Sequence, residues 1–302
     1  LQIRDIVFLI FIAFLLMTAI HPLVVFLERL RMPRVVGILL VYAVVFGFFG
    51  ASLVGAVPAL IVQSTRLVQE LPGFAARVLP YWNIDVSTIS QQIAPIGESV
   101  VKVTLGIFSN FVTVVTVLAF TFYFLMERSH ADDILRNIIG ETAGTQVITI
   151  LRAIERRLGA WVRGELLLMS FVGIFCFVGL TMLHVEFALP LAILAGLLEL
   201  VPMIGPTVSA IPAVLVALAV SPFLALSVAA LYIIVQQVEN NILVPIIMKK
   251  SVGFAPVITI LTLMIGGRLA GVVGAILSIP VALVIQELLM VVLSKHPAKS
   301  KS

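Results

Sequence analysis

A single ionisable residue interrupts one of the most apolar parts of this sequence. Over residues 187–226, Glu199 is the only acidic or basic side chain. A lone acid at membrane depth costs on the order of a few kcal/mol and must face protein or water instead of lipid. Helix breakers follow it at once: Pro202, Gly205 and Pro206. Prolines leave backbone groups unbonded, so residues 199–206 predict a broken or re-entrant helix, as found at transporter binding sites.

Two interpretations of Glu199 remain open. In the functional one, its carboxylate and the freed carbonyls line a polar path, and the acid responds to protons or cations. In the structural one, the carboxylate bonds to backbone amides or to an arginine and holds the break together. Both predict the same turn, and they differ only in whether transport depends on the acid.

A second polar cluster closes a later apolar stretch, at residues 236–241. Gln236, Glu239 and Asn240 share a helical face at i, i+3 and i+4 spacing. With Glu199, the cluster predicts a transport path lined by Glu199, Gln236, Glu239, Asn240 and Asn241. The alternative is an ordinary helix end at the membrane interface, because asparagine tolerates cap conformations.

Small residues near the C-terminus predict a helical hairpin over residues 254–294. The glycines Gly267 and Gly271 form a G-x-x-x-G pattern, and such residues let helix backbones approach closely. The set assigned to the hairpin and its packing is Gly266, Gly267, Arg268, Gly271 and Gly274. This ladder is also compatible with a homo-oligomer.

The composition indicates the class of protein to which these polar residues belong. Apolar residues make up 61% of the chain and charged residues only 11%, against about 45–50% and about 25% in soluble domains. The sequence therefore predicts an all-α, polytopic helical membrane protein with broken or re-entrant helices, whose partners are membrane lipids and a small-molecule or ion substrate. The basic residues are scattered, which predicts no nucleic-acid partner.

The sequence lacks the motifs of known catalytic and cofactor sites. It has no G-x-x-x-x-G-K-[ST], no H-E-x-x-H and no nucleophile elbow. Its four histidines lie far apart along the chain. We therefore expect no catalytic residue, no cofactor, no metal and no ATP motor.

Apolar stretches of roughly 20 residues mark the spans. They predict two transmembrane helices over 1–58, followed by an extracytoplasmic helical segment over 59–99. A transmembrane helix over 100–127 and a cytoplasmic amphipathic segment over 128–163 come next. The chain then forms a C-terminal transmembrane bundle over 164–294, with the break at 199–206, and ends in a tail over 295–302. Arginine and lysine gather in the loops after the first and third spans and in the tail, which places these parts and the C-terminus in the cytoplasm.

These residues in this order resemble the autoinducer-2 exporter family. The resemblance rests on Leu200 to Pro206, Glu239-Asn240-Asn241, Pro245 to Gly253, and Ile265-Gly266-Gly267 with Gly274 to Pro280, and the early stretch from Pro22 to Pro33 also fits. It covers essentially the whole chain. The family pattern has one more hydrophobic span before Ile6, so the resemblance implies a preceding span that this sequence lacks.

The resemblance implies a bacterial inner-membrane exporter of a small solute, named for the quorum-sensing signal autoinducer-2. Some members of the family are linked to sodium/proton exchange, so a Na⁺/Li⁺–proton antiporter is the alternative. A third hypothesis comes from another class: a membrane scaffold that transports nothing and recruits partners through its amphipathic cytoplasmic helix over 147–161.

Overall fold

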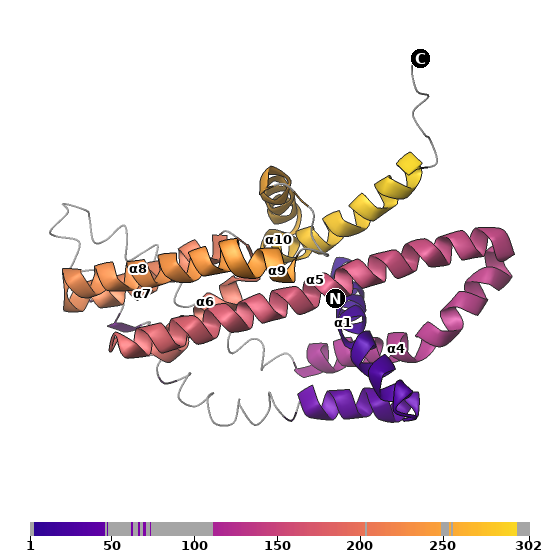
Figure 1. Cartoon of the computed structure of the whole chain (residues 1–302), viewed down its shortest axis with the longest axis horizontal. Coiled ribbons are helices and arrows are strands. Elements are labelled where there is room, and N and C mark those ends of the chain that lie inside the picture. The colour runs from indigo at the N-terminus through magenta and orange to yellow at the C-terminus, as the bar shows by residue number, and fades with distance from the viewer. Residues whose placement is uncertain are drawn as a thin grey trace, which may run out of the picture. The chain divides into compact units, whose positions relative to one another are not determined.

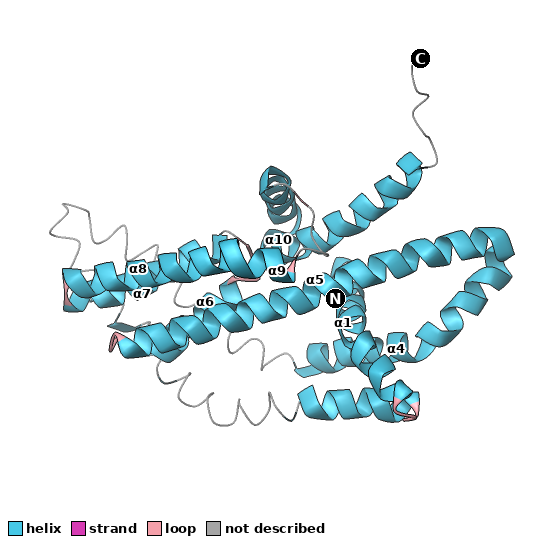
Figure 2. Cartoon of the chain, in the orientation of Figure 1, coloured by secondary structure: helices cyan, strands magenta, loops and turns pink. Residues whose placement is uncertain are grey.

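The structure is a computed structural model that describes residues 3–45, 47, 62, 66, 69–70, 73, 111–202, 204–248, 254 and 256–294. All regular structure in these residues is helical (Figure 2). Within them, four helices are long and apolar enough to cross a membrane. The prediction of an all-α, polytopic membrane protein is confirmed. The predicted segment 59–99 lies almost wholly outside the described residues, and the tail over 295–302 lies entirely outside them.

The described helices follow one another along the chain as labelled in Figure 1. They are α1 (Ile3–Arg29), a short helix over Arg34–Val45, α4 (Phe111–Ile139), α5 (Glu141–Met182), α6 (Ala188–Leu198), α7 (Ile204–Val220), α8 (Pro222–Val238), the π-helical turn η2 (Glu239–Leu243), α9 (Val244–Ile247) and α10 (Pro256–Ser294). They form two compact units. Unit 1 holds residues 1–45, 112–164 and 248–302, and unit 2 holds residues 46–111 and 165–247.

The longest described helix, α5, continues across one of the predicted boundaries. The sequence separated a cytoplasmic segment over 128–163 from a span beginning near Leu166, but α5 runs through that point without a break. No proline lies in α5, and its arginines and glutamates are good helix formers. A helix of 42 residues is about 63 Å long, whereas the bilayer core is about 30 Å thick. About half of α5 must therefore lie outside the hydrocarbon.

The turn that separates α4 from α5 is made by Gly140. α4 extends to Ile139, but it bends by 68° between Val112–Arg128 and His130–Ile139, close to the predicted end of its span at residue 127. Gly140 has φ +84°, and its N–H donates to the carbonyl of Arg136 at 2.9 Å. Glycine favours this left-handed conformation because it has no Cβ, and it commonly ends helices this way.

Within unit 1, α5 packs closely against α1. Pro22 lies inside α1 and cannot donate to the carbonyl of Thr18, four residues earlier. Arg163 of α5 donates to that carbonyl instead, with Nη1 at 3.2 Å from the oxygen. A Cβ on Gly159, one turn before Arg163, would overlap the same oxygen. The glycine permits the close approach, and the arginine satisfies the acceptor that the proline leaves free.

The predicted C-terminal hairpin is present in α10, and its turn lies just after Arg268. Ala270 (φ −144°, ψ 25°) and Gly271 (φ 60°, ψ −143°) leave the helical conformation, and the second pair of angles is essentially restricted to glycine. A Cβ on Gly266 would overlap the carbonyl of Gly274, and the reverse also holds. These two glycines form the close contact between the arms, while Arg268 is exposed near the turn.

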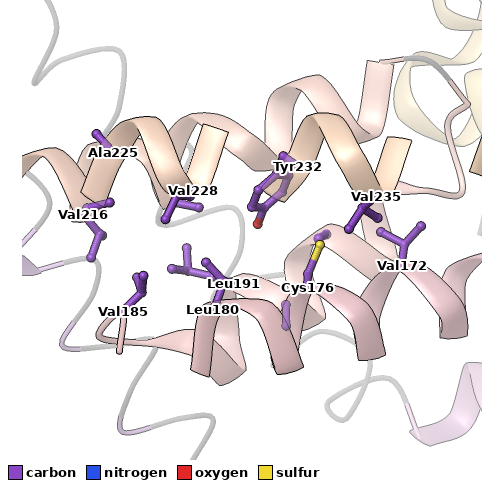
Figure 3. Close-up of a cluster of buried hydrophobic side chains, with 14 residues drawn as sticks. Val172, Cys176, Leu180, Val185, Leu191, Val216, Ala225, Val228, Tyr232 and Val235 are labelled. Carbon is purple, nitrogen blue, oxygen red and sulfur yellow. The ribbon is translucent and has the colours of Figure 1, made fainter. Parts of the chain in front are cut away.

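Unit 2 is built around an apolar core shared by α5, α6, α7 and α8 (Figure 3). The second half of α5 contributes Val172, Cys176 and Leu180, and α8 contributes Val228, Tyr232 and Val235, in steps of three or four that place them on one helix face. Val172 and Val235 lie at the same end of the core (Figure 3). The core therefore holds α5 and α8 face to face.

The break predicted at 199–206 divides α6 from α7. α6 ends at Leu198 and α7 begins at Ile204. Pro202 lies in the break, and Pro206 lies in the first turn of α7, where a helix does not need the missing N–H. A Cβ on Gly205 would overlap the carbonyl of Leu198. The two helix ends can approach this closely only because residue 205 is glycine.

The start of α8 gives a first stability prediction. The N–H of Leu224 donates to Oγ of Ser221 at 3.1 Å, and Pro222 occupies the first helical position. We expect Ser221→Ala to lower the stability of the protein by about 1 kcal/mol, because it removes this N-cap. The measurement is the thermal unfolding midpoint of the purified protein in detergent. Ser227→Ala is the matched control, because its exposed hydroxyl only donates to Phe223 of the same helix, and an equal shift in both variants would contradict the prediction.

Candidate transport site

Three buried glutamates lie close together in unit 2. The exposed fraction is 3% for Glu165, 1% for Glu199 and 5% for Glu239. The carboxyl group of Glu199 lies within hydrogen-bonding reach of that of Glu239 and interacts electrostatically with that of Glu165. Glu165 and Glu239 also interact electrostatically. Because buried acids are costly and rare in apolar surroundings, their convergence marks the candidate functional site of this protein.

Each glutamate ends a stripe of buried residues. On α5, Glu165 precedes Leu168 and Val172 on the same face. On α8, Glu239 follows Tyr232 and Val235 at the same spacing. Because Val172 and Val235 lie at one end of the core (Figure 3), the two acids must lie beyond that end.

The third glutamate is supplied by the break between α6 and α7. Glu199 is the C-cap residue of α6, and its N–H donates to the carbonyl of Ala195 at 3.2 Å. Its side chain continues the buried face that Leu191 and Ala195 begin. The break thus lets the chain turn away while the acid stays at the end of the core.

A hydrogen bond between the carboxyl groups of Glu199 and Glu239 would require a proton. Two ionised carboxylates have only acceptor atoms, so they can share a hydrogen bond only when one of them is protonated and donates to the other. Like charges at this distance in a poorly solvated place also oppose joint ionisation. The pair is therefore suited to hold a proton and to exchange it for another cation.

Each of the three carboxyl groups also has a buried oxygen without a hydrogen-bond partner among the described residues. These atoms are Oε1 of Glu165, Oε2 of Glu199 and Oε2 of Glu239. Leaving a buried acceptor unpaired costs about 1–3 kcal/mol. In native structures such atoms are usually partnered by a ligand, an ion or a water. Within the described ranges, no three histidine, cysteine or acidic side chains have the geometry of a metal site.

Glu239 also begins the π-helical turn η2. The N–H of Val244 donates to the carbonyl of Glu239, five residues earlier, so the turn holds one residue more than an α-helical turn. Pro245 follows and cannot donate to the carbonyl of Asn241 as an α-helix would require. π-turns of this kind occur frequently at functional sites.

The structure separates the polar residues predicted to line one path. Glu199 and Glu239 come together, but Asn240 and Asn241 are exposed and Gln236 is half-buried. Nδ2 of Asn241 donates to Oε1 of Gln237 at 3.2 Å. The buried face at this end of α8 passes through Tyr232, Val235 and Glu239, and Asn240 lies about 100° further around the helix than Glu239. Whether Gln236, Asn240 and Asn241 take part in transport stays a prediction.

Glu165 was missed by sequence reasoning. It directly precedes the apolar stretch and follows Arg163 closely, so it resembles an ordinary charged residue outside the membrane. A signal was present, because Glu165, Leu168, Val172 and Cys176 follow one another in steps of three and four. An acid that continues a buried stripe in phase is expected to face the core and not the solvent.

Comparison with known proteins agrees with this description. The sequence matches the family described as AI-2E family transporter over residues 1–294. The candidate transport protein YrrI of Bacillus subtilis (strain 168) is 28% identical over 299 residues, which cover 93% of this chain and 84% of the relative. The candidate transport protein YhhT of Escherichia coli (strain K12) is 27% identical over 291 residues, covering 91% of this chain and 82% of the relative.

A further relative is named as a permease. The candidate permease PerM of Escherichia coli (strain K12) is 28% identical over 250 residues, covering 80% of this chain and 70% of the relative. The family match, the relatives and the apolar helices together indicate a multi-pass membrane protein of a transporter family. The resemblance seen in the sequence motifs is thereby confirmed, and this chain belongs to the AI-2E transporter family.

Proposed function

We propose that this protein exports a small polar solute of the autoinducer-2 type across the bacterial inner membrane, with its C-terminus in the cytoplasm. In this proposal the three glutamates form the proton site that couples transport to the proton gradient. The observation that carries it is the approach of two buried acids, Glu199 and Glu239, whose carboxyl groups lie within hydrogen-bonding reach of each other. Ionisable groups inside membrane-embedded bundles commonly mark proton or ion pathways.

The second candidate is a monovalent cation/proton antiporter. The unpartnered carboxylate oxygens of Glu165, Glu199 and Glu239 favour it, because oxygen atoms are the ligands that hard cations prefer. In that mechanism a Na⁺ or Li⁺ ion would enter as the shared proton leaves, and the charge of the cluster would stay compensated throughout.

One experiment separates the two candidates. The protein is reconstituted into liposomes that contain a pH-sensitive dye, and an inward or outward proton gradient is imposed. Exporter function predicts gradient-driven flux of a labelled furanone that a protonophore abolishes, with no response to Na⁺. Antiport predicts proton release on addition of Na⁺ or Li⁺ and no furanone flux. Absence of both responses in protein that is folded would contradict both proposals and leave the scaffold hypothesis.

A further inference from the structure

A polar cavity of about 560 Å³ lies wholly within unit 1. It is formed by α1, the helix over Arg34–Val45, α4 and α5. Its wall holds five arginines against two acids, Asp132 and Glu155. The arginines are Arg34, Arg128, Arg152, Arg156 and Arg163. Concave sites lined by one sign of charge concentrate ligands of the opposite sign.

The sequence of α5 places three of these arginines on one side of the helix. Arg152, Arg156 and Arg163 follow the spacing i, i+4 and i+11, which confines them to an arc of about 40°. Gly159 and the Thr18 carbonyl bring this side of α5 close to α1. The basic surface is therefore fixed by helix packing and not by flexible loops.

The acids near the cavity compensate only some of these arginines. Arg128 pairs with Asp132 at 3.1 Å and with Glu155 at 2.9 Å, and Arg152 also pairs with Asp132. Arg34 pairs with Glu28 at 3.2 Å. Among the described residues, three of the five arginines thus have an acidic partner, and two do not.

The uncompensated charge falls on Arg156 and Arg163. Among the described residues, Arg163 donates to the backbone carbonyls of Thr18 and Ala19, at 3.2 and 3.3 Å, and forms no ion pair. Arg156 has no acidic partner among the described residues, although it lines the cavity. Nη2 of Arg34 is buried without a hydrogen-bond partner in the part of the chain that the structure describes. The wall therefore offers both net charge and an unused donor.

We propose that this cavity binds a phosphate group, carried either by a free phosphate anion or by the headgroup of an anionic phospholipid. Guanidinium groups bind phosphate oxygens with paired, charge-assisted hydrogen bonds. The cavity volume is in the range of small-molecule sites. The surrounding arginines also follow the pattern of cytoplasmic, juxtamembrane segments, where anionic headgroups are found. The residues that line the cavity belong to unit 1, and the three glutamates belong to unit 2.

The test uses the full chain, purified in an uncharged detergent without phosphate. Binding of inorganic phosphate is measured by equilibrium dialysis with radiolabelled phosphate, and lipids retained through purification are quantified by mass spectrometry. Arg156→Gln is expected to weaken phosphate binding at least about tenfold, the effect of losing one charged hydrogen-bond partner. Because Arg156 is exposed and without an acidic partner in the described residues, the variant should keep the unfolding midpoint of the wild type.

Arg29→Gln is the matched control, since it removes an equal charge from an exposed position outside the cavity. Saturable phosphate binding that only Arg156→Gln weakens supports a free anion as the ligand. Retained phosphatidylglycerol that only Arg156→Gln depletes supports a lipid headgroup. The proposal is overturned if the wild type shows neither, or if both variants reduce binding equally, because the effect would then come from overall charge.

Discussion

Glu199→Gln is expected to reduce coupled transport at least tenfold and to abolish its pH dependence, while the protein still folds. Glutamine has the shape of a protonated glutamate and can donate to Glu239, so the buried contact survives. It cannot release a proton, so the pair can no longer alternate between a shared proton and another cation. A tenfold loss of transport rate corresponds to about 1.4 kcal/mol. This is less than the free energy that an unpaired buried charge costs a protein.

The measurement is the initial rate of furanone flux or of cation-induced proton release in proteoliposomes, taken across a range of pH values. Glu186→Gln is the matched control, because Glu186 is an exposed glutamate of the same unit. If Glu199→Gln transports at the wild-type rate with the same pH profile, then the acid only holds the break together. Loss of activity accompanied by loss of the unfolding transition would also point to that structural role.

The second large effect is expected from Gly205→Ala. A Cβ at this position would overlap the carbonyl group of Leu198, which is backbone and cannot move aside as a flexible side chain can. We expect a loss of stability of about 3 kcal/mol or more, at the upper end of overpacking changes. The break between α6 and α7 would open, and Glu199 would be displaced from the end of the core.

The thermal unfolding midpoint and the yield of monodisperse protein report this effect. Gly173→Ala is a suitable control in the same unit, because the nearest atom to its added Cβ is the carbonyl oxygen of Ala192 at an ordinary 3.6 Å. Equal stability of the two variants would show that the helix ends can separate at little cost, and that residue 205 need not be glycine.

The break and the hairpin could be predicted because their chemistry is local. Proline lacks an N–H and glycine lacks a Cβ, so Pro202, Gly205 and Pro206 together favour a break, whereas a single proline such as Pro22 can stay inside its helix. The exact turn of the hairpin could not be read in the same way. Gly266 and Gly271 are the same residue type. Only packing decides that Gly266 contacts the opposite arm and that Gly271 adopts the positive φ.

The candidate site could be predicted only in part, because burial depends on the phase of a helix as well as on residue type. Glu199 was found since its surroundings are apolar in sequence. Glu165 lies close to charged residues in sequence. It is buried because its position around α5 faces the core. Asn240 was grouped with Glu239 by its spacing from Gln236, but the buried face passes through Tyr232, Val235 and Glu239 and leaves Asn240 exposed.

The π-helical turn has a further consequence for the length of the chain. Each residue of an α-helix turns the backbone by about 100°, and η2 contains one residue more than an α-helical turn would. Deleting a residue between Glu239 and Val244 would therefore rotate α9 by about 100° relative to α8. At this point the register of the two helices is encoded by the number of residues, so the identity of exposed Asn240 matters less than its presence.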